Sequence, residues 1–225
     1  MESLAPVICR LFDLPEHERS GRRPRASRPI LRAARPGAGR VILLTGPSGA
    51  GKTSLLAQLR HSIECDQIDL SRVALPDRPT IDCVAGRVVG PSADDEAVES
   101  GIVEALRLLS AVGLAEARDY LRPPRKLSTG QRFRLRLAMA LARPEGESPL
   151  VLVGDEFAAS LDDLTAAVVS RCLRRAVDAR RTWLGAIVAT GRAALRPALA
   201  PDVTVCCDFD EWRIDPLSAS ANRGG

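Results

Sequence analysis

The sequence predicts an α/β protein with a mostly parallel sheet core and a small inserted helical subdomain. Three apolar runs rich in Val, Ile and Leu, at residues 41–45, 150–153 and 184–190, are typical of strands buried on both faces. Stretches with helical periodicity lie between these runs. Strands that alternate with helices along a chain favour a parallel sheet.

These elements fit one domain, or one domain with a small insertion. The chain has 225 residues, 45% of them hydrophobic and only 3% aromatic, so Leu, Val, Ile and Ala must build the core. No stretch approaches the roughly 20 uncharged apolar residues that a membrane span needs, and the N-terminus lacks the pattern of a signal peptide. Six cysteines show no CxxC or Cys/His ligand spacing. We therefore expect a cytoplasmic protein with reduced thiols and no transmembrane segment.

Residues 1–40 are expected to hold an N-terminal strand and an Arg/Pro-rich loop. Eight arginines, three prolines and no acidic residue lie between Arg19 and Arg40, and this segment alone makes the chain basic, at a net charge of +4. Its prolines and glycines argue against a helix and predict an extended loop. Two interpretations stay open: a solvated loop, or a contact with a nucleic-acid backbone or an acidic protein.

A glycine-rich turn joins the run at 41–45 to a helix expected over 52–63. It matches GxxxxGK[ST], the phosphate-binding pattern called Walker A, in the strand-to-helix context that this pattern requires. Glycines let main-chain N–H groups converge on phosphate oxygens, and the helix N-terminus adds its positive end. Lys52 is expected to reach the β- and γ-phosphates, and the Thr53 hydroxyl to ligate Mg²⁺. The nucleotide-binding residues predicted here are Gly46, Pro47, Ser48, Gly49, Ala50, Gly51, Lys52, Thr53 and Ser54.

A pair of acidic residues follows the apolar run at 150–153. Asp155 can hold the Mg²⁺ shell there, in the manner of a Walker B motif, and Glu156 can polarise the attacking water. The carboxyl ends of parallel strands are where open α/β sheets bind ligands. The two motifs together predict Mg²⁺-dependent binding and hydrolysis of ATP, with Lys52 and Glu156 as catalytic residues and Thr53 and Asp155 as metal ligands.

Three further helices are expected. One covers residues 94–112, with Gly113 as a candidate C-cap, and the next covers 130–143. A third is expected over 161–181, and Ser160 is a candidate for its N-cap.

The last elements are two short runs at 203–207 and 212–214, which predict a terminal hairpin. Cys206 and Cys207 are adjacent in the first run, and on a strand they would face opposite sides. The expected organisation is an ATPase domain at 41–215, with a helical subdomain at about 86–145 inside it and a flexible tail at 216–225.

The order of the motifs indicates a family. The residues 127–131, LSTGQ, resemble the LSGGQ signature of ATP-binding cassette (ABC) ATPases, and 155–162, DEFAASLD, resemble their Walker B motif plus D-loop. With the Walker A motif, four motifs stand in the family's order over about residues 41–207, so the chain resembles an ABC-type P-loop NTPase. It is also similar to a soluble, non-transporter branch related to ATPases fused to a predicted acetyltransferase domain, in which Phe follows the acidic pair as Phe157 does.

The resemblance implies a head-to-tail dimer that encloses two ATP molecules and acts as a conformational switch. Ser128, Gly130 and Gln131 of one copy would face the γ-phosphate held by the Walker A loop of the other. Asp162 of the D-loop would join the same nucleotide site. Ser128 and Gly130 also stand at an expected helix N-terminus, whose free N–H groups suit an anion.

Some residues of the family pattern are replaced or missing. A switch histidine follows the strand after the D-loop in the family, but Gly191 and Arg192 stand at that place here. No clear Q-loop glutamine appears. Phe12 is either the aromatic residue that stacks on adenine or ordinary core filling. These departures predict weaker hydrolysis before they predict lost binding.

Two alternatives to a soluble ATP-driven switch stay open. The chain could be the ATPase subunit of an ABC transporter whose membrane subunit is a separate chain. It could also be a low-turnover, ATP-dependent nucleic-acid-binding module that uses the Arg19–Arg40 segment.

Overall fold

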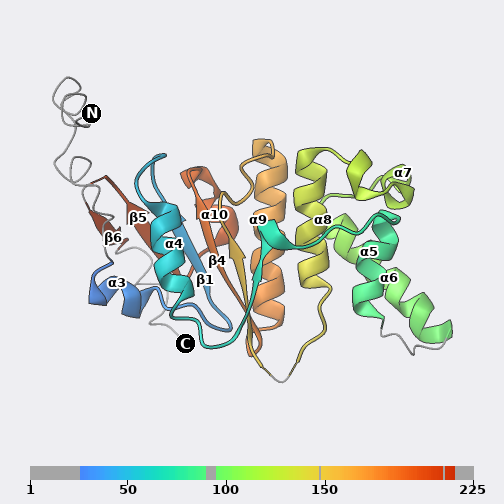
Figure 1. Cartoon of the computed structure of the whole chain (residues 1–225), viewed down its shortest axis with the longest axis horizontal. Helices are drawn as coiled ribbons and strands as arrows, with labels where there is room; N and C mark the ends of the chain where they lie inside the picture. Colours follow the sequence, from blue (N-terminus) through green and yellow to red (C-terminus); the bar gives the residue numbers. More distant parts are fainter. Residues whose placement is uncertain (1–25, 90–94, 147, 210, 216–225) are drawn as a thin grey trace, which may run out of the picture.

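A computed structural model describes residues 26–89, 95–146, 148–209 and 211–215. In this part of the chain the strands form one six-stranded sheet with the order β2-β3-β4-β1-β5-β6, and the labelled strands β1, β4, β5 and β6 lie in the left half of the view in Figure 1. Its strands are β1 (Val41–Thr45), β2 (Asp66–Asp69), β3 (Leu150–Gly154), β4 (Leu184–Thr190), β5 (Val203–Cys207) and β6 (Trp212–Ile214). All neighbouring strands pair in parallel except β5 and β6, which form the expected hairpin. The predicted α/β class with a mostly parallel sheet is confirmed.

The centre of the sheet is buried on both faces. Every residue of β1, β3 and β4 is buried, which explains why these strands consist of continuous apolar runs. Strand β1 pairs with β4 on one side and β5 on the other, so that Leu44 lies beside both Ala189 and Val205. The loop after β1 therefore emerges between the ends of two neighbouring strands.

Helices cover both faces, and alternate residues of each central strand point to different helices. The helices are α3 (Arg28–Ala33), α4 (Lys52–Arg60), α5 (Thr80–Val88), α6 (Asp95–Ala111), α7 (Ala117–Leu121), α8 (Thr129–Leu141), α9 (Asp163–Ala179) and α10 (Arg196–Leu199). Short 3-10 helices of the described residues lie at Leu70–Arg72, Pro124–Lys126 and Ala193–Leu195. Ile42 and Leu44 pack with α3 and α4, while Val41 and Leu43 belong to the cluster that includes α8 and α9.

Helices α5 to α8 pack together beside α9, away from β5 and β6 (Figure 1). The first of them, α5, begins at Thr80, and the helical subdomain expected at about 86–145 stays a prediction. Gly113 follows α6 with a φ of 82°, and the N–H group of Leu114 donates to the Leu109 carbonyl oxygen, as expected of a glycine C-cap. Among the described residues, none of the helices combines the length and the apolar character needed to cross a bilayer.

The prediction of an extended loop between Arg19 and Arg40 is wrong over Arg28–Ala33, because these residues form α3. Pro29 stands in the first turn of this helix, where a missing N–H group breaks no helical hydrogen bond. Burial of Ile30 against the sheet stabilises the helix. The expected N-terminal strand, Phe12 and residues 19–25 of the arginine-rich segment lie outside the described residues.

The N-cap expected at Ser160 is also wrong. Helix α9 begins two residues later, and its cap is Asp162, whose Oδ1 accepts a hydrogen bond from the Thr165 N–H group at 2.9 Å. This bond is the main reason that the pKa of the Asp162 carboxyl lies below its ordinary value. Residues 156–160 instead form a turn, in which Glu156 and Ala158 have positive φ angles of 47° and 57°.

Candidate active site

The phosphate loop connects the end of β1 to the start of α4. Gly46 has a φ of 148°, and a side chain there would begin 2.0 Å from the Cys207 carbonyl oxygen, so only glycine fits between the loop and β5. Helix α4 begins after Gly51 without a side-chain cap. Its first N–H groups are therefore available to an anion at the positive end of the helix.

The side chain of Lys52 points toward the start of the phosphate loop. Its Nζ atom donates to the carbonyl oxygens of Gly46 at 2.9 Å and Pro47 at 2.6 Å. The ammonium group is thus held at the loop by two main-chain acceptors. Phosphate oxygens are stronger acceptors because they are charged, so this lysine is placed to exchange one kind of oxygen for the other.

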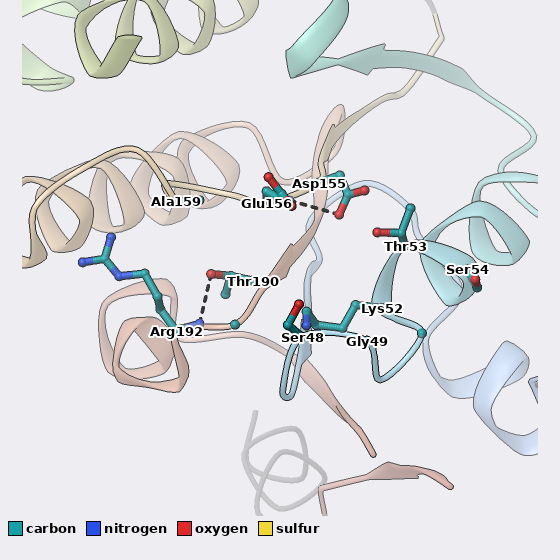
Figure 2. A pocket seen from close by; sticks show the side chains of 12 residues that line it. Ser48, Gly49, Lys52, Thr53, Ser54, Asp155, Glu156, Ala159, Thr190 and Arg192 are labelled. Carbon is teal, nitrogen blue, oxygen red and sulfur yellow. Dashed lines mark hydrogen bonds between the residues drawn. The ribbon is translucent and has the colours of Figure 1, made fainter. Parts of the chain in front are cut away.

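A cavity of about 490 Å³ opens in front of the loop. It brings together the two halves of the site predicted from sequence, because the Walker A loop and the acidic pair line the same space (Figure 2). Its lining residues are Ser48, Gly49, Gly51, Lys52, Thr53, Ser54, Asp155, Glu156, Ala159, Thr190, Gly191 and Arg192. The remaining loop residues, Gly46, Pro47 and Ala50, do not line it.

The acidic pair is shaped by a tight turn at the end of β3. Asp155 Oδ1 accepts a hydrogen bond from the Glu156 N–H group at 3.0 Å, and the Phe157 N–H group donates to the Ala189 carbonyl oxygen at 2.8 Å. Phe157 is fully buried and meets Phe133 edge to face, with ring centroids 5.5 Å apart. Anchoring of Phe157 leaves Glu156 exposed at the cavity, in a left-handed conformation that a non-glycine residue rarely adopts.

Arg192 lies just after β4, one of the two residues expected in place of the family's switch histidine, and its side chain is directed to the D-loop. Its Nη1 atom donates to the carbonyl oxygens of Ala158 at 2.9 Å and Leu161 at 2.7 Å, and its Nη2 atom forms an ion pair with Asp163. Figure 2 shows its guanidinium group turned away from Lys52 and toward Ala159. The arginine therefore holds the segment that leads from the acidic pair to α9.

The signature motif forms the N-terminus of α8. Ser128 and Gln131 form a reciprocal capping box, and the Gln131 Nε2 atom donates to buried Asp119 at 2.7 Å. A side chain at Gly130 would begin 2.9 Å from Leu161 Cδ2, so the signature turn and the D-loop touch within one molecule. The structure does not bring Ser128, Gly130, Gln131 or Asp162 into the phosphate-loop cavity.

Ala159 and Thr190 line the cavity but were missed in the sequence. Thr190 ends a buried strand, as Thr45 does before the phosphate loop. The two threonines lie side by side in the sheet because β4 pairs with β1. The sequence does show a polar residue at the end of an apolar run. It does not show the strand order, which places Thr190 beside the phosphate loop.

The sequence also matches the model of a known protein family. The family model described as the AAA ATPase domain matches residues 28–188. This match exceeds half of the chain, so the chain belongs to the AAA ATPase domain family. Together with the loop and the cavity, this makes it a P-loop ATPase that binds ATP.

Part of the chain is similar to a named relative. The phosphonates import ATP-binding protein PhnC of Hyphomonas neptunium is 43% identical over 76 residues, which make up 34% of this chain and 27% of PhnC. The chain thus matches well under half of that relative.

Two solved structures share the fold. The MJ0796 ATP-binding cassette, dimeric and bound to ADP and Pi after hydrolysis, has a TM-score of 0.58 at 19% identity, over 83% of this chain and 87% of that one. The cbiO1 protein of Clostridium perfringens, part of the ABC transporter complex cbiONQ, has a TM-score of 0.55 at 19% identity, over 83% and 81%. These likenesses show that the chain has the fold of ABC ATPase domains. Its resemblance to ATPases fused to an acetyltransferase domain stays a prediction.

Proposed function

We propose that this chain hydrolyses Mg²⁺-ATP at the cavity in front of the phosphate loop, and that ATP joins two copies head to tail as a conformational switch. The observation that carries the proposal is the convergence of Lys52, Thr53, Asp155 and Glu156 on one cavity. These residues follow β1 and β3, two strands that are far apart in the sequence, and each belongs to a type that phosphoryl transfer requires.

The residues fit Mg²⁺ as well as the nucleotide. Thr53 and Asp155 supply one hydroxyl and one carboxylate oxygen at the same cavity, and Mg²⁺ is commonly held by one or two protein oxygens together with phosphates and water. When bound, Mg²⁺ would neutralise charge on the β- and γ-phosphate oxygens.

The protein's own groups would then position the reaction. Loop N–H groups and the N-terminus of α4 would bind the phosphates, while Lys52 would move from its two carbonyl acceptors to phosphate oxygens. Glu156 would accept a hydrogen bond from a water aligned on the γ-phosphorus and take its proton as the new P–O bond forms. The bond to ADP breaks on the opposite side, and inorganic phosphate is released.

The dimer is supported by where the signature lies. Ser128 is exposed, and Gly130 lies against Leu161 of the D-loop. The signature motif and the D-loop therefore share one face, which lies outside the cavity of their own molecule. A second copy would have to bring Ser128, Gly130, Gln131 and Asp162 to the γ-phosphate. The MJ0796 cassette has been solved as a dimer.

Glu156→Gln tests the catalytic assignment. Phosphate release should fall by about 10²–10³-fold, because the amide cannot take the proton. ATP binding should persist, and size-exclusion chromatography with Mg²⁺-ATP should show a trapped dimer. Glu99→Gln, an exposed carboxyl on α6, is the matched control and should hydrolyse ATP normally. Wild-type turnover by Glu156→Gln would refute the assignment.

A second candidate function is the ATPase subunit of a transporter with a separate membrane chain. It is favoured by the 76-residue match to PhnC, an import ATP-binding protein. Co-purification of a membrane protein with the tagged chain would support it. The comparisons give no support to a nucleic-acid partner, and Arg35 and Arg40 of the basic segment bind Glu64 and the Ala33 carbonyl oxygen, respectively.

A further inference from the structure

The order of the strands gives a direction to the bound nucleotide. The phosphate loop follows β1, the acidic pair follows β3 beyond β4, and β5 and β6 lie on the other side of β1 (Figure 1). Under the proposed function, on which this inference rests, the γ-phosphate faces Asp155 and Glu156. The ribose and base must then leave the loop away from the acidic pair, on the side of β5 and β6.

Phe209 stands on that side, in the turn after β5. Its Cε1 atom is 3.3 Å from the point where a side chain at Gly49 would begin, so its ring edge lies directly against the phosphate loop. The residue is 40% exposed, whereas most large apolar side chains of the described chain are buried. An aromatic ring that remains in water beside a nucleotide loop leaves apolar surface open to a ligand.

The turn that presents Phe209 is held in place. The Phe209 N–H group donates to Asp208 Oδ1 at 2.8 Å, and the Asp208 N–H group donates to the Glu211 carbonyl oxygen at 2.9 Å. Trp212 in β6 is 7% exposed, and its Nε1 atom donates to the Ala50 carbonyl oxygen at 3.0 Å. The hairpin is thus fastened to the phosphate loop by its buried tryptophan, and Phe209 lies at a defined position.

We propose that Phe209 is the platform on which the nucleobase of the triphosphate stacks. Every base has a π-face, and an aromatic ring binds it by stacking without reading its hydrogen-bonding edge. Phe209 would then contribute to affinity for the nucleoside portion and nothing to affinity for the phosphates. This role separates it from Lys52 and Thr53, which bind only the phosphate end.

Calorimetry with two ligands in the presence of Mg²⁺ tests this role. ATP carries a base, and inorganic tripolyphosphate carries only the phosphate chain. Phe209→Ala should weaken ATP binding by about 10-fold, within the range of base–aromatic stacking, and leave tripolyphosphate binding unchanged. Phe209→Trp should keep ATP affinity. Val103→Ala, which also shortens an exposed apolar side chain, is the control and should change neither.

The outcomes distinguish this inference from the proposed function. Unchanged ATP affinity in Phe209→Ala would overturn the platform, and a loss in Phe12→Ala instead would assign the base to the N-terminal segment. An equal loss for ATP and tripolyphosphate in Phe209→Ala would also overturn it, because the variant would then have disturbed the loop. Failure of the wild-type chain to bind either ligand would overturn the proposed function itself.

Discussion

Cys206 and Cys207 are neighbours in the sequence but belong to different environments. As expected for a strand, Cys206 is exposed and Cys207 is only 2% exposed, beneath the phosphate loop. Burial raises the pKa of the Cys207 thiol to about 11, although the charge of Lys52 counteracts part of this shift. The thiolate is the reactive form, so Cys207 is protected by its pKa as well as by its burial.

This difference predicts the order of alkylation. In the native protein at mildly alkaline pH, iodoacetamide should modify Cys206 well before Cys207, as read by peptide mass spectrometry. Unfolding in urea should abolish the difference, because it exposes both thiols. Modification of Cys207 at the same rate as Cys206 in the folded protein would contradict the buried position of the Cys207 side chain.

Asp69 makes the stability of the fold depend on pH. Burial raises the pKa of its carboxyl, but hydrogen bonds from Ser71 and Arg60 outweigh burial, and the pKa lies below its ordinary value. A pKa that is lowered in the folded state stabilises the fold above the unfolded-state pKa of about 4. This contribution is lost as the pH falls through the lower, folded-state pKa.

Asp69→Asn should therefore lower the free energy of unfolding at neutral pH by about 1–2 kcal/mol, since it breaks the 2.7 Å pair with Arg60. The difference from wild type should shrink as the pH falls below about 4. Urea unfolding at several pH values measures both effects. Asp66→Asn is the control, because its pair with Arg143 is largely exposed and should matter little.

At the scale of the element, local sequence patterns predicted those strands and loops that depend only on contiguous residues. The strands at 41–45, 150–154 and 184–190 and the phosphate loop follow from contiguous residues, because a doubly buried strand needs an unbroken apolar run. The N-cap of α9 and helix α3 were missed, because Asp162 competes with Ser160 and Pro29 is harmless in a first turn.

The parts of the site that escaped prediction depend on strand order. Arg192 reaches the D-loop because β4 lies between β1 and β3, which no local pattern reveals. Phe209 reaches Gly49 because β5 lies beside β1. Contacts between segments this far apart in the chain become visible only when the sheet is assembled.

Arg192→Ala tests the link between β4 and the D-loop. It leaves the carbonyl oxygens of Ala158 and Leu161 without their charged donor, so stability should fall by about 2 kcal/mol. As a positioning residue, Arg192 should affect kcat more than the KM for ATP. Arg192→Lys should not restore kcat, because one ammonium group cannot reproduce the planar fork. Arg171→Ala on exposed α9 surface is the control, and a kcat equal to wild type in Arg192→Ala would contradict the link.

At the scale of the whole molecule, a head-to-tail dimer predicts complementation. Lys52→Ala destroys the phosphate loop of its own copy, and Ser128→Arg destroys the signature that the copy offers to its partner. Each variant alone should be inactive. A mixed dimer would contain one site with both defects and one intact site, so an equal mixture should recover about a quarter of wild-type turnover. No recovery despite mixed dimers, detected through different tags, would exclude the head-to-tail arrangement.

The position of β1 has a consequence for how the protein is made. This strand is the first described strand along the chain, yet its partners β4 and β5 begin only at Leu184 and Val203. While those residues are still inside the ribosome, β1 cannot pair with β4 and β5, and the phosphate loop that follows β1 is not held in place. Nucleotide can therefore stabilise the fold only after synthesis has passed Val203, and pairing across such a long stretch is intrinsically slow. Premature termination anywhere before the last strands should yield a product that ATP cannot rescue.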